Sequence, residues 1–167
     1  MAEIPSTPAD GNTTVLIVPA IADTSAPTAA ELTGDSVIDI SCYLTADGWA
    51  PSQEQATIDD ARLCSRQTFN RPGQKSYGLE ITYIDNTNSE YESDNLAAET
   101  LVEGSDHYLV VRRGVAYEEP MASGQIVQVW PVTAGMQRDV PPEANSVIRT
   151  VQGMFVRGEV TRVPVAA

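Results

Sequence analysis

Short segments rich in β-branched and aromatic residues recur along the chain, and each is bounded by glycine, proline or small polar residues. In residues 76–85, for example, Tyr77, Leu79, Ile81 and Tyr83 occupy alternate positions, which is the period of a strand with one buried face. Helical segments do not alternate with these strands, so a parallel βαβ sheet is disfavoured. The pattern predicts a mainly β fold, either a β-sandwich or a partly closed barrel, with one flanking α-helix. The predicted strands are residues 13–19, 37–43, 55–63, 76–85, 107–113, 124–132 and 146–163, the last interrupted at Gly153 and Gly158.

One substantial helix is predicted at residues 93–102. Ser93 or Asp94 can cap its N-terminus, apolar residues follow at helical spacing, and Gly104 comes after its end. A shorter helical turn is expected at residues 28–32. The connections expected to lie outside strands are the stretch with Asp47-Gly48 and Pro51, the long loop 64–75 with its turn pair Pro72-Gly73, and the loop 134–145.

The chain has the length of one ordinary domain, 167 residues. Residues 1–12 contain Pro5, Pro8 and Gly11 among small polar residues, so we expect a flexible N-terminal arm. Residues 13–167 are then a single β domain. We expect no signal peptide, because the first residues carry no basic region, and no membrane segment, because no apolar run approaches the ~20 residues that a span requires.

The distribution of charge predicts contacts between copies of the chain. The net charge is −13, which argues against a surface that follows nucleic-acid phosphates. Residues 61–79 are an exception, because they contain no acid and carry a charge of +4, which leaves −17 on the rest. The basic residues of this segment are Arg62, Arg66, Arg71 and Lys75. A long basic loop that also bears Phe69, on an acidic body, is self-complementary.

The sequence contains no recognisable catalytic or metal-binding motif. His107 is the single histidine, and its neighbours Ser105 and Asp106 would suggest a dyad, but adjacent residues of a strand point to opposite faces. We therefore expect a structural role for His107. Cys42 and Cys64 belong to no metal or redox motif, and we expect them to be reduced and partly buried, with a disulfide between them left open.

Acidic pairs such as Asp59-Asp60 and Glu118-Glu119 do not follow the spacing of a calcium loop, and no phosphate-binding or nucleophile-elbow motif is present. The sequence therefore predicts no catalytic residues, no metal, no cofactor and no enzymatic activity.

The layout of the chain resembles that of the major tail tube proteins of long-tailed (siphovirus-type) bacteriophages. The features that carry the resemblance are the N-terminal arm, Glu31-Leu32-Thr33-Gly34 before a strand, the long loop through Phe69-Asn70-Arg71-Pro72-Gly73, the helix before His107-Tyr108-Leu109-Val110-Val111-Arg112-Arg113, and the closing β segment interrupted by glycine.

The resemblance implies a structural protein of the virion tail, made and assembled in the host cytoplasm. Such proteins form six-membered rings that stack into a hollow tube, whose inner wall is a continuous β-barrel. Their long loop and terminal arms reach the neighbouring ring. DNA passes through an acidic lumen without specific binding, and the implied partners are a tape-measure protein, a tail terminator and baseplate or distal tail proteins. On this basis the candidate inter-ring contact residues are Arg66, Phe69, Arg71 and Lys75, and the candidate lumen acids are Asp59, Asp60 and Glu80.

Two alternatives remain open at the level of the sequence. A head–tail completion or capsid-decorating protein would share this composition but would form a single ring or a trimer. A ligand-binding β-sandwich could use Trp49, Tyr77, Tyr83 and Trp130 to line a sugar site, although Trp130 lies in an apolar strand that favours a core position.

Overall fold

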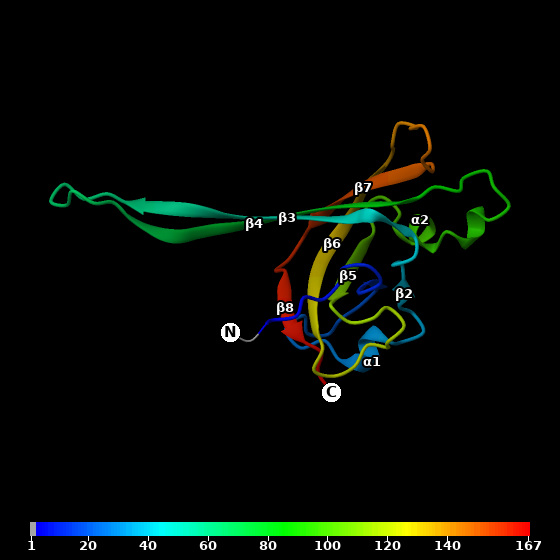
Figure 1. The fold of residues 1–167 in the computed structure, drawn as a ribbon, viewed down its shortest axis with the longest axis horizontal. Coiled ribbons are helices and arrows are strands. Elements are labelled where there is room, and N and C mark those ends of the chain that lie inside the picture. Colours follow the sequence, from blue (N-terminus) through cyan, green and yellow to red (C-terminus); the bar gives the residue numbers. More distant parts are fainter. Residues whose placement is uncertain (1–2) are drawn as a thin grey trace.

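The computed structural model describes residues 3–167 and shows a mainly β chain with little helix (Figure 1). The strands are β1 (Thr13–Val18), β2 (Ile38–Asp39), β3 (Leu44–Asp60), β4 (Phe69–Ile84), β5 (Asp106–Arg113), β6 (Ile126–Asp139), β7 (Arg149–Val156) and β8 (Thr161–Pro164). The helices are α1 (Ala29–Leu32), a 3-10 turn at Glu92–Asp94, and α2 (Leu96–Thr100).

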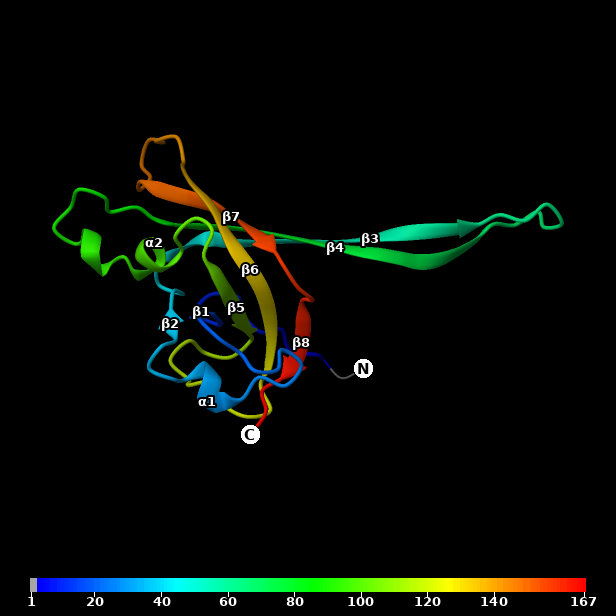
Figure 2. The same ribbon diagram turned by 180° about the vertical axis from the view of Figure 1, so that it is seen from behind.

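All strands belong to one antiparallel sheet, in the order β2-β1-β5-β6-β7-β4-β3. The sheet branches at β6, because Ile126–Val129 of β6 pair with β8 and the later residues pair with β7. The sheet is curled into a half-barrel, with α1 near one end and α2 near the other (Figures 1 and 2). The predicted mainly β fold is confirmed, and of the two architectures left open by the sequence the partly closed barrel, rather than the β-sandwich, is the one observed.

Apolar residues are buried on both faces of the sheet. In β1, Val15 and Ile17 belong to a large cluster around Trp130, whereas Leu16 and Val18 belong to a smaller cluster beneath α1. Burial on both faces explains why β1 is a continuous apolar run without alternation. Trp130 is fully buried and makes edge-to-face contacts with Trp49 and Tyr77, at centroid distances of 6.0 and 5.7 Å. The core position predicted for Trp130 is confirmed, and it lines no open sugar site.

The helical turn predicted at residues 28–32 is confirmed as α1, which begins with a capping box between Thr28 and Glu31. The helix predicted at residues 93–102 is wrong in its start and length. Asn95, rather than Ser93 or Asp94, caps α2, because its side chain accepts a hydrogen bond from the Ala98 N–H at 3.2 Å.

Other predicted boundaries also need correction. Within residues 37–43 only β2 pairs as a strand, because the Ser41 hydroxyl takes the place of a backbone partner and accepts a hydrogen bond from the Val15 N–H at 2.8 Å. The predicted loop 134–145 is strand up to Asp139. Gly153 does not interrupt β7, whereas Gly158 lies between β7 and β8 as expected.

Candidate assembly surface

Strands β3 and β4 form a hairpin that projects far beyond the body of the protein (Figure 1). Strand β4 pairs with β7 only from Leu79 to Ile84, so the part of the hairpin beyond Leu79 has no third strand beside it. We call residues 51–78 the hairpin arm and residues 61–68 its tip loop. At about 3.3 Å per residue, the ten strand residues 51–60 extend roughly 33 Å. Nearly all residues of the arm are exposed.

The arm corrects the prediction of a long loop at residues 64–75. Phe69, Arg71 and Lys75 lie on strand β4, and Arg66 alone of the four candidate contact residues lies in a loop. The break predicted around Asp47-Gly48 and Pro51 is likewise wrong, because β3 runs through it. The strand predicted at residues 55–63 is the distal part of β3, which ends at Asp60. Sequence periodicity missed the distal part of β4, because a strand exposed on both faces has no apolar alternation to detect.

Gly73 permits an irregularity in the middle of the arm. The pairing shifts between Gln55 opposite Lys75 and Thr57 opposite Pro72, so β4 carries one extra residue there. A Cβ atom on Gly73 would lie 2.9 Å from the carbonyl oxygen of Ala56. Glycine at this position therefore allows the two backbones to approach closely.

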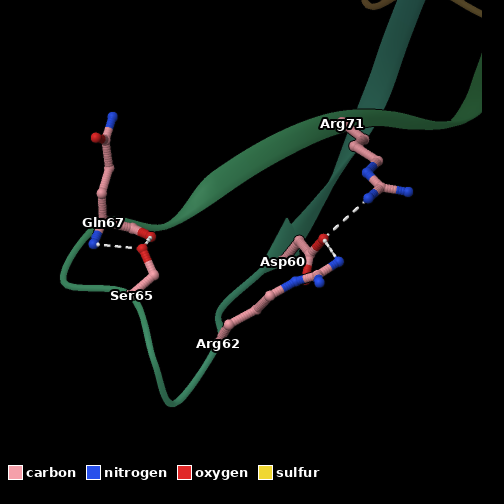
Figure 3. Close-up of polar contacts among 5 residues, drawn as sticks. All are labelled: Asp60, Arg62, Ser65, Gln67 and Arg71. Atoms are coloured by element: carbon pink, nitrogen blue, oxygen red, sulfur yellow. Dashed lines mark hydrogen bonds and ion pairs between the residues drawn. The ribbon is translucent and has the colours of Figure 1, made fainter.

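Side-chain hydrogen bonds order the tip of the arm (Figure 3). The Asp60 carboxylate accepts hydrogen bonds from Arg62 Nε and Nη2, at 3.2 and 3.1 Å, and from Arg71 Nη2 at 2.9 Å. The Ser65 hydroxyl donates to the Gln67 carbonyl at 2.8 Å and accepts from the Gln67 N–H at 3.1 Å. One carboxylate thus ties the start of the tip loop to the strand that leaves it.

Large apolar side chains lie in solvent around this tip. Ile58 and Phe69 are each 55% exposed, and Leu63 is fully exposed in the tip loop. Ile58 and Asp60 lie on the same face of β3, and their cross-strand partners are Arg71 and Phe69 respectively. We call Ile58, Leu63 and Phe69 the apolar tip. Such a cluster, exposed beside charged side chains, is typical of a contact surface for another protein.

The three candidate lumen acids do not lie together. Asp59 and Asp60 are at the far end of the arm, whereas Glu80 is opposite Ala50 near the body, ten residues away along β3. Glu80 accepts a hydrogen bond from Arg138 Nη2 at 2.7 Å, and Asp60 is paired with two arginines. Among the ion pairs of residues 3–167, Asp59 takes part in none.

The sheet face opposite the Trp130 cluster is open on β4 and β7. Glu80, Thr82, Val151 and Phe155 lie on this side, all exposed or half-buried, and Phe155 is 69% exposed. We call this surface the open sheet face. The outer edge of β3 beside it has no strand partner among the described residues.

A buried glutamine links this sheet to α2. Gln152 is fully buried, and its Nε2 donates to the carbonyl oxygens of Leu101 and Gly135 at 2.8 and 2.7 Å. The Tyr83 hydroxyl donates to Gln152 Oε1 at 3.3 Å. Burial raises the pKa of Tyr83 to about 12, with a further contribution from the charge of Asp85. Sequence reasoning missed this network because its members lie far apart in the chain.

A buried arginine holds the connection between β5 and β6. Arg112 donates hydrogen bonds to the carbonyl oxygens of Ala116, Glu119 and Pro120, at 3.1, 2.7 and 3.0 Å. Desolvation lowers the pKa of Arg112, against the charge of Glu119. The arginine therefore organises a loop that has no regular secondary structure.

One step of the sequence argument about His107 was wrong. Ser105 and His107 do converge, sharing a hydrogen bond of 2.8 Å between Oγ and Nε2, because residues two apart face the same way. Asp106 points elsewhere and accepts from Thr133 Oγ1, so no triad forms. Burial is the main cause that lowers the pKa of His107.

Residues 3–167 contain no group of three or more potential metal ligands. Cys42 and Cys64 are both free and exposed, so the partial burial predicted for them is wrong. No helix in this range is long and apolar enough to cross a membrane.

Comparison with known proteins identifies relatives by sequence family and by fold. A family model described as phage tail tube protein matches residues 1–167. No curated protein sequence matches the chain.

Three solved structures resemble the chain along almost its whole length. The baseplate structure of the anti-feeding prophage contains a chain with a TM-score of 0.56 and 8% identity, covering 99% of this chain and 100% of that one. A sheath–tube complex of an extracellular contractile injection system, PVC, in its extended state gives 0.53 and 12%, with 96% and 93% covered. The tube-terminating cap of the anti-feeding prophage gives 0.50 and 13%, with 99% and 95% covered. At these identities the likeness shows a common fold.

Proposed function

The chain belongs to the phage tail tube protein family, and on this premise we propose that its copies close into hexameric rings that stack into a hollow tube. It is a structural protein, not an enzyme. DNA passes through the lumen of the tube without specific binding. The observation that carries the proposal is the hairpin arm with its apolar tip.

The arm supports the proposal because no other strand of the chain pairs with it beyond Leu79. A two-stranded ribbon in water is marginally stable, and a third strand or a packing surface is needed to hold it. The apolar tip adds two half-exposed side chains and one fully exposed side chain, Leu63, that gain free energy when another surface covers them. We assign the arm to the contact with the neighbouring ring, with Arg66, Phe69, Arg71 and Lys75 among its contact residues. Of these, Arg71 also holds the tip through Asp60.

The open sheet face supports a lumen lined by strands. An open sheet with a long unpaired edge such as β3 is prone to uncontrolled association, and closing copies into a ring covers that edge. We propose that the open sheet face turns inward and that Glu80 lies on the lumen wall. Asp59 and Asp60 lie at the far end of the arm, so they line the lumen only if the arm itself lies along the wall. Asp60 contributes less negative potential there, because two arginines neutralise its charge.

Partners of the tube follow from its place in a tail. The relatives of the same fold occur in a baseplate, a sheath–tube complex and a tube-terminating cap. We propose a tape-measure protein, a tail terminator and baseplate or distal tail proteins as partners here. The layout of the sequence favours the tail of a long-tailed phage. A contractile tail is the second candidate, because the solved structures of this fold come from contractile injection systems and the anti-feeding prophage.

Truncation of the arm tests the stacking role. Residues 56–74 are replaced by Asn-Gly, which joins the paired residues Gln55 and Lys75 by a two-residue turn. Neither buried cluster contains a residue of the removed segment, so the body stays folded. Negative-stain images and sedimentation should show rings without tubes. Tubes of normal length from this variant would refute the stacking role.

Point variants of the arm refine the same test. Covering Phe69 contributes roughly 1.5–3 kcal/mol per copy, whereas an exposed ion pair contributes ~0.2–1 kcal/mol. Phe69→Ala should therefore shorten tubes more than Arg66→Ala does. High salt should weaken stacking in all variants without abolishing it, because the apolar contribution is not screened.

A further inference from the structure

A groove near the N-terminal segment lies on the side of the sheet away from α1. It has a volume of 420 Å³, and the one large apolar side chain exposed in its lining is Ile126, since Val111 and Val127 beside it are buried. Residues 7–9 form one wall. Ile126 is 48% exposed on strand β6, so the apolar surface is open to solvent.

Two arginines also line this groove, Arg113 on β5 and Arg162 on β8. Both are exposed, and neither takes part in the ion pairs found among residues 3–167. No acidic residue lines the groove. On a chain of net charge −13, the groove is thus a local basic site with one exposed isoleucine, Ile126.

The connection between β4 and α2 has the opposite character. No lysine or arginine occurs between Lys75 and Arg112, and this connection carries Glu90, Glu92 and Asp94 around the exposed Tyr91. Figures 1 and 2 place it on one side of the body, whereas β8 and the N-terminal segment lie on the other side.

We propose that the groove of one copy binds the β4–α2 connection of a second copy, with Tyr91 against Ile126, and with Glu90 and Asp94 near Arg113 and Arg162. The contact joins two different surfaces on opposite sides of the body, which is a heterologous contact, and such contacts generate closed rings when the rotation closes. It is a contact within a ring, and it rests on the proposed self-assembly but not on the role of the arm.

The charge of the hairpin arm makes it a poor occupant of this groove. Residues 57–75 of the arm carry four basic and two acidic residues, so the arm tip would be repelled by the two arginines. The acidic β4–α2 connection is attracted to the same groove.

A charge swap tests the contact in the full-length chain. Arg113→Glu with Arg162→Glu should weaken ring formation about tenfold or more, because attractive pairs become repulsive ones. Glu90→Arg with Asp94→Arg should weaken it similarly, and the four changes together should restore rings. Asp35→Arg with Glu118→Arg, which alters two exposed acids elsewhere, is the matched control and should leave rings intact. Sedimentation velocity at low salt measures each variant. Rings that survive the groove reversal, or that the fourfold swap fails to restore, would overturn the proposal.

A disulfide trap separates this contact from tube formation. In a Cys42→Ser, Cys64→Ser background, Tyr91→Cys with Ile126→Cys should give covalent multimers under oxidation, and Phe69→Cys with Ile126→Cys should not. Multimers from the first pair in a protein that forms no tubes would support the contact and contradict the stacked-tube function. Multimers from the second pair alone would show that the arm occupies the groove and would overturn the inference.

Discussion

Replacing Arg112 by methionine should destabilise the protein severely, although the residue lies in no contact surface proposed above. The side chain is 1% exposed and donates five hydrogen bonds. Three go to backbone carbonyls of the β5–β6 connection, and two go to Thr14 Oγ1 and Gln125 Oε1, at 3.0 and 3.1 Å. Methionine keeps the length of the stem and removes every donor.

The expected loss combines two opposing effects. A hydrogen bond from a charged donor contributes roughly 1.5–3 kcal/mol, so five independent bonds would give about 7–15 kcal/mol. Removing the guanidinium recovers several kcal/mol of desolvation cost, and water can reach the carbonyls on the partly buried side of the loop. The net loss should be about 3–5 kcal/mol, which corresponds to a fall in Tm of roughly 6–20 °C for a chain of this length.

Urea and thermal unfolding of dilute, monomeric protein measure this loss. Arg113→Met is the matched control, since the neighbouring side chain is exposed and makes no ion pair among the described residues, and it should change stability by less than about 0.5 kcal/mol. Arg112→Lys should recover only part of the loss, because an ammonium group cannot span five acceptors. A loss below about 1 kcal/mol for Arg112→Met would refute the reasoning, since it would mean that the loop carbonyls find other partners at no cost.

Three further outcomes are expected. Gln152→Leu should cost about 1–3 kcal/mol in urea unfolding, because it leaves the buried carbonyls of Leu101 and Gly135 unpaired; an unchanged midpoint would contradict this. Gly73→Val should lower the protease resistance of the arm while the thermal midpoint of the body stays the same, since its Cβ would crowd Ala56. The pKa of His107 is lower in the folded than in the unfolded state, so the unfolded state binds more protons and the free energy of unfolding should fall as the pH drops through 6.5. If the wild type and His107→Gln lose the same free energy of unfolding between about pH 7.5 and 5.5, the prediction is wrong.

The local sequence pattern was sufficient to predict those segments whose burial does not change along their length. The buried strands β1 and β5, the helical turn α1 and the core position of Trp130 were predicted from spacing and residue type. Net charge and the absence of catalytic motifs are properties of the sequence itself. The layout of these features was also enough to indicate the family that the full-length match established.

The arm and the buried polar groups depended on the tertiary structure. A strand exposed on both faces lacks an apolar alternation, so the distal part of β4 was predicted as loop although the distal part of β3 was predicted as strand. The full lengths of both strands followed only from their pairing. The pairing of Asp60 with Arg71 and the contact of Gln152 with Leu101 join residues eleven and fifty-one positions apart. Sequence periodicity indicates which face of a segment is buried, but it does not indicate which distant segment packs against that face. The partners of a buried or paired polar side chain are therefore set only when the sheet has folded.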